Sequence, residues 1–387
     1  MRRTRTRRRT IYISAGVFSG IGCLVMMAFP SVALNAAQRG IALWASSVLP
    51  ALLPFFICAN FMTALGLPAH IGRIFERPFQ KLFGAPGVSA FVFSVSITSG
   101  YPMGAKLIGD LGRSRAITKS DAKRMLSFCS TSGPLFMLGA VGAGMLASPA
   151  AGAVIALSHY LGALLNGVLC SLLAFERSVP SQAAPTDTGL KKGSLLDLFT
   201  DSMIASFRAL GIICGYIVLF MMITDFIELT GMLDYIRADF GRSLVKGVME
   251  MTVGCSGIAE SVGLSLLYQC MLCAFLISFG GFSVYAQSMS MLAGLNISSA
   301  YYIAVKLSHG LLAAAIAWFI GPPLLGREAL AVISLQKEEI VGRLGFFSQL
   351  LFSTKMVIMI VILFVFTILL DKLLRWIHES FRDHSGV

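Results

Sequence analysis

Charged side chains are scarce in this chain. Only 13% of its 387 residues are Asp, Glu, Lys or Arg, whereas 56% are hydrophobic. Soluble globular domains carry roughly 25% charged residues, so this composition excludes a soluble globule. It predicts an all-α polytopic membrane protein, in which each spanning helix uses about 20 apolar residues.

Signatures of catalysis are also missing. No apolar stretch carries an HExxH or GxSxG motif, and no paired carboxylates lie one or two helical turns apart beside a nucleophile. The eight cysteines all lie in apolar stretches, and the CxxC spacing of Cys270 and Cys273 is typical of helix packing rather than of redox or metal chemistry. We therefore expect no enzymatic activity, no metal and no cofactor.

Positive charge is unevenly placed along the chain. The net charge of +12 could indicate a nucleic-acid partner, but six arginines fall in Met1–Thr10 and most other basic residues lie in short loops between apolar tracts. This is the positive-inside pattern of a protein whose partner is the lipid bilayer. The apolar run Ile11–Pro30 has no clear A-x-A cleavage site after it, so we expect a retained first span with a cytoplasmic N-terminus.

The stretch Ser96–Leu111 places glycines, a proline and Lys106 inside an apolar tract. Irregular backbone at membrane depth is tolerated only inside protein or beside water, and a lysine there costs at least ~2.5 kcal/mol. Basic loops flank this tract on both sides. We therefore expect Ala85–Leu111 to be a re-entrant hairpin broken near Ser99–Gly104; the alternative is a close-packed helix whose lysine reaches the interface.

A second interruption is expected at Ser130–Pro134, inside the span Met125–Ser148, because hydroxyl residues followed by Gly-Pro favour an unwound segment. A proline kink capped by its own hydroxyls is the alternative. On the return span Ala150–Phe175, His159 and Asn166 are interpreted as contacts between helices rather than as ligands.

The second half of the chain repeats features of the first. Thr98-Ser99-Gly100 and Lys106 match Thr252-Val253-Gly254 and Glu260 at a constant offset, and the segment around Gly133 has a looser counterpart in Ser278–Ser283. Loop charges orient the second half oppositely and make Val248–Leu264 a second re-entrant hairpin. The prediction is about eight transmembrane helices plus two re-entrant hairpins in inverted repeats, which is a transporter's architecture.

Composition divides the chain into five parts. They are 1–40, a basic N-terminus and first transmembrane helix; 41–175, the first repeat; 176–200, a polar cytoplasmic linker; 201–320, the second, inverted repeat; and 321–387, a loop, a last transmembrane helix and a basic C-terminus.

Four runs resemble a known family. LPALLPFFI, SGYPMGAKL, SFCSTSGPLFMLGAVG and SFGGFSVYAQ, which begin at residues 49, 99, 127 and 278, are similar to sporulation integral membrane proteins of the YlbJ (SpoVV) type, which carry two nucleoside-recognition (Gate) domains. The resemblance implies transport of dipicolinic acid across the mother-cell-derived outer forespore membrane, and kinship with concentrative nucleoside transporters. The alternatives are a nucleoside-type transporter, or a non-transporting scaffold that assembles with other sporulation membrane proteins.

Dipicolinate is a small aromatic dianion, so its site should offer cations, backbone N–H groups at helix breaks and aromatic rings. Lys106 is the first candidate cation, and Lys306, with His309 on the same helix face, is the second. We expect Glu260 to pair with Lys106, or alternatively to couple transport to protons, and expect Glu250 and Asp225 to be interfacial. The predicted substrate-binding residues are Ser99, Gly100, Tyr101, Lys106, Ser132, Gly133, Gly254, Ser256, Glu260, Gly281, Ser283 and Lys306.

Overall fold

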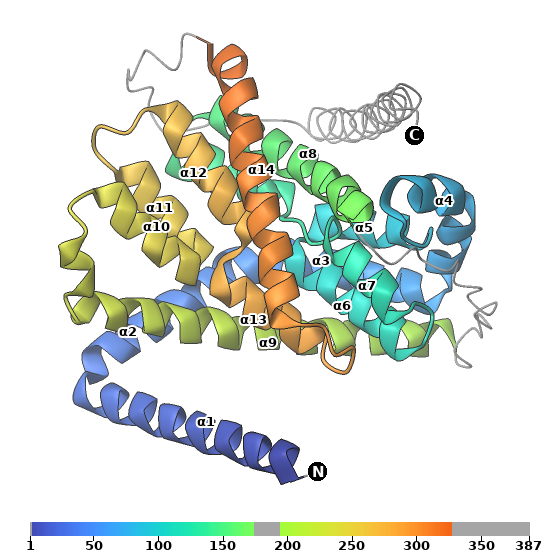
Figure 1. Ribbon diagram of the computed structural model, residues 1–387, viewed down its shortest axis with the longest axis horizontal. Coiled ribbons are helices and arrows are strands. Elements are labelled where there is room, and N and C mark those ends of the chain that lie inside the picture. Colours follow the sequence, from blue (N-terminus) through green and yellow to red (C-terminus); the bar gives the residue numbers. More distant parts are fainter. Residues whose placement is uncertain (1, 174–193, 327–387) are drawn as a thin grey trace, which may run out of the picture.

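The structure is a computed structural model that describes residues 2–173 and 194–326, and every regular element in those residues is helical (Figure 1). The first half contains α1 Arg2–Ala28, α2 Pro30–Leu43, η1 Trp44–Val48, α3 Leu49–Ala64, α4 Leu67–Phe83, α5 Ser89–Ser99, α6 Tyr101–Arg113, α7 Lys119–Leu126, η2 Leu135–Met145 and α8 Pro149–Leu173. The second half contains α9 Leu195–Leu229, η3 Met232–Tyr235, α10 Asp239–Met249, α11 Met251–Glu260, α12 Leu266–Phe279, α13 Gly281–Met291 and α14 Ser299–Leu325.

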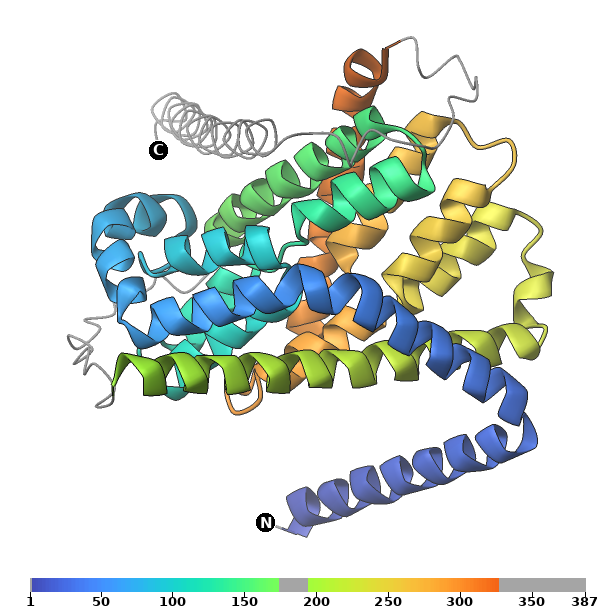
Figure 2. The ribbon, with the colours of Figure 1, turned by 180° about the vertical axis from the view of Figure 1, so that it is seen from behind.

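Helix α1 stands apart from the rest of the molecule (Figure 2). It ends at Ala28, and α2 starts with Pro30 after a bend of 106°. A proline suits the first turn of a helix because its missing N–H would have no partner there. The helix of the expected first span therefore ends at Ala28, two residues before the predicted end, and it passes as a span only together with Pro30–Ser46. Five apolar side chains in the described part of α1 are more than half exposed, as is typical of a helix that contacts lipid: Ile13, Val17, Ile21, Leu24 and Met27.

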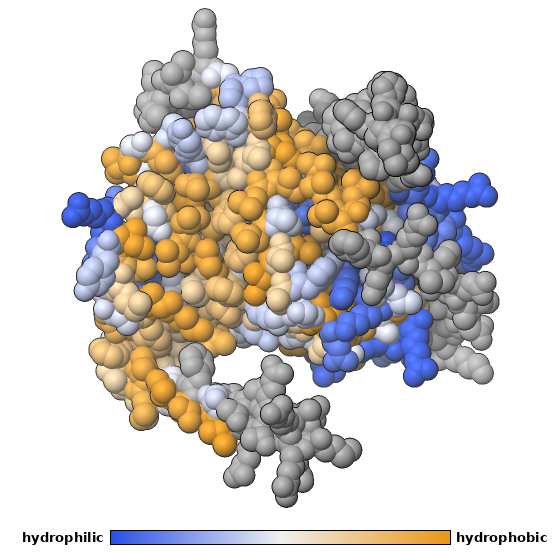
Figure 3. All heavy atoms as spheres, viewed as in Figure 1, coloured by the Kyte–Doolittle hydropathy of each residue, from blue (hydrophilic) through white to orange (hydrophobic). Residues whose placement is uncertain are grey.

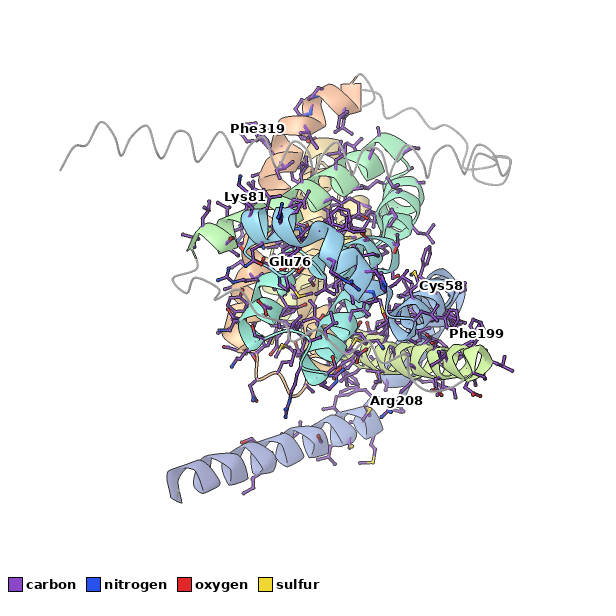
Figure 4. The ribbon with its side chains drawn as sticks, turned by 90° about the vertical axis from the view of Figure 1, so that its right-hand side faces the viewer. Cys58, Glu76, Lys81, Phe199, Arg208 and Phe319 are labelled. Atoms are coloured by element: carbon purple, nitrogen blue, oxygen red, sulfur yellow. The ribbon has the colours of Figure 1, made fainter. Side chains whose placement is uncertain are left out.

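The second expected span, Ile41–Leu67, starts earlier, because α2, η1 and α3 continue one another from Pro30. The π-helical turn η1 precedes Pro50, whose ring would clash with a regular helical carbonyl. This long helix runs beside α9, and Figure 4 shows Cys58 of α3 and Phe199 of α9 on neighbouring stretches. Asp225 of α9, expected at the interface, pairs with Arg39 at 2.5 Å.

Two of the helix pairs that a single residue joins correspond to the expected hairpins. The first break is Gly100, between α5 and α6, whose φ of 84° is accessible chiefly to glycine. The second is Glu250, between α10 and α11. A Cβ on Gly254 would lie 2.2 Å from the Gly247 Cα, so these two helices pack back on each other at their glycines.

The second pair differs from its prediction. It runs over Asp239–Glu260 rather than Val248–Leu264, and its break lies at Glu250, not at Gly254, the residue that was matched to Gly100. The constant offset that matched Gly100 to Gly254 is therefore wrong at the break. Glu250, which was expected at the membrane interface, is buried within the protein: it is 4% exposed, and its carboxylate accepts hydrogen bonds from the backbone N–H groups of Thr252 and Val253.

Each pair is followed by an interrupted helix and then by a long one. Residues 127–133 between α7 and η2 are not helical, as expected, and Gly280 interrupts the helix formed by α12 and α13. The long helices α8 and α14 follow, and they pack against each other (Figure 1). The order of hairpin, broken helix and long helix thus occurs twice in the described residues.

The described residues contain four helices long and apolar enough to span a membrane, or six if each bent pair counts as one span. The predicted total of eight included Lys355–Leu370, which lies outside the described residues, as does most of the linker 176–200. The last six residues of that linker are helical, because α9 begins at Leu195.

One group of exposed basic side chains lies on one side of the molecule. They come from α4 and from the end of α6 with its following turn: Arg73, Arg77, Lys81, Arg113 and Arg115. Figure 3 shows hydrophilic residues on that side and apolar residues over most of the remaining visible face. The segment α5–α6 between these two basic regions starts and ends on the same side, which is what a re-entrant hairpin requires.

Candidate functional site

The non-helical segment 127–133 is held by buried side chains of neighbouring helices. Tyr160 of α8 donates its hydroxyl to the Ser132 carbonyl at 3.1 Å, and the Ser132 N–H donates to Nε2 of His159 at 2.8 Å. On the other side, the hydroxyls of Ser96 and Thr131 lie 3.0 Å apart. Unwound backbone at membrane depth needs such partners for its polar groups, so the segment is fixed rather than loose.

His159 has a defined tautomer in this arrangement. Because a backbone N–H only donates, Nε2 of His159 accepts from Ser132, and its Nδ1 carries the proton that it shares with Ser278 Oγ at 2.8 Å. Its backbone carbonyl accepts from Nε2 of His309 at 2.9 Å. The interpretation of His159 as a contact between helices agrees with this geometry, because it joins α8, α12 and α14 to the unwound segment.

Lys306 of α14 is the buried cation at the centre of this region. It is 2% exposed, and its ammonium donates to the Ser130 carbonyl at 2.9 Å. The ammonium also lies 4.8 Å from the centroid of the Tyr101 ring and 3.5 Å from Nδ1 of His309. Among the described residues no carboxylate pairs with it.

Half of the predicted site residues meet around this lysine. Tyr101 begins α6 at the first hairpin break, and its hydroxyl donates to the Ile277 carbonyl of α12. Gly100 and Gly133 face each other, since a Cβ on Gly100 would lie 3.6 Å from the Gly133 nitrogen. The structure thus gathers one group of predicted residues: Ser99, Gly100, Tyr101, Ser132, Gly133 and Lys306.

Lys106 and Glu260 do not form the expected ion pair. The Lys106 ammonium donates to Asp110 at 2.8 Å and to Asn60 at 2.7 Å. Glu260 is exposed and accepts from Ser256 one helical turn earlier. The two charges were paired because they lie at a constant offset in the two halves of the sequence. The helix breaks at Gly100 and Glu250 do not follow that offset, and in the structure each charge has a partner on its own helix.

The remaining predicted residues serve packing around the second hairpin. Gly254 lies against Gly247, as described above. Gly281 starts α13, and a Cβ there would approach the Gly247, Val248 and Met249 carbonyls to 3.0–3.3 Å. Ser283 is buried and accepts a hydrogen bond from Gln287. These contacts connect the hairpin tip to the break at Gly280.

The sequence analysis missed several residues that surround Lys306 and the non-helical segment 127–133. Ser130 lies in the hydroxyl run that was recognised as a break, yet only Ser132 and Gly133 were named as ligands. Ser278 begins the run that was matched to the segment around Gly133, but it was not named as a ligand. Tyr160 carries no pattern that sets it apart from ordinary helix residues. The described residues hold no cluster of side chains suited to a metal ion.

These features define a class: a multi-pass α-helical integral membrane protein whose interrupted helices surround a buried cation. The chain is similar to the sporulation integral membrane protein YlbJ of Bacillus subtilis (strain 168), with 27% identity over 327 residues, 77% of this chain and 80% of that protein. The resemblance to the YlbJ type is confirmed by this match. No family model and no solved structure matches the chain, so the assignment of Gate domains stays a prediction.

Proposed function

We propose that this protein is a transporter that acts in spore formation and moves a small aromatic dianion, dipicolinic acid, across the outer forespore membrane. Its termini are proposed to face the mother-cell cytoplasm, and its two repeats to be inverted. The relative's name supports the link to sporulation. The observation that carries the transport proposal is Lys306, a buried ammonium without a carboxylate partner among the described residues.

A buried ammonium is expensive because it gives up its hydration, and such charges are normally paired. Lys306 has a carbonyl, an imidazole nitrogen and an aromatic face instead. These neighbours tolerate the charge but do not neutralise it, so a transported anion can supply the missing negative charge. The Tyr101 ring beside the ammonium suits an aromatic acid, because it offers a flat apolar surface.

Three chain interruptions meet or approach this lysine: Gly100, the segment 127–133 and the Gly280 region through His159 and Ser278. Discontinuous helices of this kind are typical of substrate sites in secondary transporters. With Lys306 2% exposed, the described conformation is closed. We therefore expect transport to require movement of the α5–α6 hairpin away from the unwound segment.

Lys106 remains a second candidate cation for the solute. Its contacts with Asp110 and Asn60 are compatible with a structural role, since Asn60 in turn donates to Ser206 of α9 at 2.9 Å. The Lys106→Ala variant is expected to abolish dipicolinate accumulation in spores while protein level and membrane insertion stay normal. Normal accumulation in that variant removes Lys106 from the site.

The test is counterflow in liposomes that contain the purified protein. Vesicles loaded with unlabelled dipicolinate should take up labelled dipicolinate from outside, and excess unlabelled dipicolinate should compete while uridine should not. Counterflow needs no knowledge of the coupling ion, because exchange is driven by the loaded solute. Competition by uridine would favour a nucleoside-type transporter, and the absence of any exchange would favour a non-transporting scaffold.

A further inference from the structure

Three buried hydroxyls near Lys306 have no hydrogen-bond partner. They belong to Ser130, Ser288 and Tyr302, which are 2%, 0% and 2% exposed. The Tyr302 hydroxyl is close enough to both serine hydroxyls to interact with them, but no pair meets the distance and angle of a full hydrogen bond in the described conformation. They come from the unwound segment, α13 and α14, so three separate elements bring them together.

Unpartnered hydroxyls are uncommon in protein interiors, because each forfeits about 1–3 kcal/mol of hydrogen-bonding free energy. A single one can be an accident of packing. Three that face one another across three elements indicate a place where another molecule's polar atoms complete the hydrogen bonds.

The same place already holds positive charge. Tyr302 and Lys306 lie one turn apart on α14, and the Ser130 carbonyl accepts from the Lys306 ammonium. All four side chains can donate hydrogen bonds, and no carboxylate pairs with Lys306 in the described ranges. A carboxylate group matches this set, since its two oxygens accept about four hydrogen bonds and it carries one negative charge.

We propose that Ser130, Ser288 and Tyr302 bind one carboxylate group of the transported solute beside the Lys306 ammonium. This inference rests on the proposed function and assigns side chains to one of the two carboxylates of the proposed solute. Tyr285, whose ring meets that of Tyr302 edge to face at 5.7 Å, lines the same side and suits an aromatic ring attached to the carboxylate. The neutral amide of such an acid should be rejected, because it lacks the charge and one acceptor oxygen.

Equilibrium binding to the purified protein tests the inference. The probes are dipicolinate, picolinate and the uncharged picolinamide. The variants Ser288→Ala and Tyr302→Phe each remove one hydroxyl with little change of shape. The controls are Ser290→Ala on the same helix, whose hydroxyl bonds to the Gln287 carbonyl, and Tyr268→Phe, whose ring is 48% exposed.

We expect both acids to bind and the amide not to bind. Each hydroxyl variant should weaken acid binding about tenfold, or about 1.4 kcal/mol, while the controls bind like wild type. The unliganded variants should melt at or above the wild-type temperature, because they lose an unpartnered hydroxyl. If one of the two hydroxyl variants fails to fold, the acid binding of the other variant tests the inference.

The outcomes separate the two proposals. Wild-type affinity in both hydroxyl variants overturns the inference and leaves the transport proposal standing. Hydroxyl-dependent acid binding without dipicolinate counterflow supports the carboxylate-binding role of the three hydroxyls and overturns the transport proposal. If the wild-type protein binds no acid, both are overturned.

Discussion

His159 shows how much of this site depends on single polar contacts. The residue is fully buried, and its ring supplies the acceptor for the Ser132 N–H and a partner for the Ser278 hydroxyl. Its ring also lies 4.8 Å from that of His309. The site therefore consists of neutral imidazole and hydroxyl groups that position backbone, with one charge among them.

Replacing His159 with leucine is expected to destabilise the protein by about 2–4 kcal/mol, because two buried polar groups lose their partner at about 1–3 kcal/mol each. The measurement is the thermal or denaturant unfolding of the purified variant in detergent. His70→Leu is the control, since His70 is exposed on α4 and should change stability by less than about 0.5 kcal/mol. Equal stability of both variants would contradict the described hydrogen bonds.

The sequence predicted part of the site at this scale. Tyr101, Ser132 and Lys306 were recognisable because a hydroxyl, a ring or a charge inside an apolar tract needs a reason. The pairing of Lys106 with Glu260 failed, since opposite charges in matching positions say nothing about distance. The cluster of Ser130, Ser288 and Tyr302 could not be foreseen, because it forms only when three elements pack together.

Some helix breaks can be predicted from the residue type at the break, and others cannot. Gly100 and the segment before Pro134 carry glycine or proline, so the backbone conformation follows from residue type. The break at Glu250 carries neither. Its extended backbone, with φ at −139° and ψ at 112°, is open to any residue. Gly254, which the sequence match aligned with Gly100, lets α10 and α11 approach closely.

Gly104 tests how tightly α6 packs on the unwound segment. A Cβ there would lie 2.2 Å from the Cys129 carbonyl oxygen, which is backbone and cannot swing away. Gly104→Ala should therefore destabilise the protein by about 1–3 kcal/mol through overpacking, as measured by unfolding.

Gly211→Ala on α9 is the matched control for Gly104→Ala. No atom lies within 4 Å of the added methyl group at Gly211, so helix propensity alone should make this variant more stable by about 0.5–1 kcal/mol. If Gly104→Ala instead behaves like Gly211→Ala, the close approach of α6 to residues 127–133 is wrong.

The whole molecule repeats one order of elements in its two halves. The order was predictable from the hydropathy pattern, the positions of glycines and the charge of the loops. The number of spans was not predictable, because a bent pair of helices can be counted as one span or as none. Inversion of the halves is still a prediction. It places the basic loops around α4 and α6 in the cytoplasm and the loop around η3 outside.

Labelling with a membrane-impermeant maleimide tests the inversion in a cysteine-free background. In intact cells that carry the protein in their plasma membrane, Tyr235→Cys, at a side chain that is 90% exposed, should react from the outer side. Lys119→Cys, at the exposed start of α7, should react only after the membrane is opened. Reaction of both from the same side would exclude the predicted topology.

The central claim is that the Lys306 ammonium supplies the counter-charge for a transported carboxylate. Its most direct test is dipicolinate counterflow by Lys306→Met beside Lys246→Met, whose lysine pairs with Glu228 in a partly exposed ion pair. We predict that Lys306→Met stays folded and loses at least about tenfold in rate, because an anion buried without its cation loses several kcal/mol of stabilisation. Lys246→Met should keep the wild-type rate. Wild-type counterflow in folded Lys306→Met would contradict the claim.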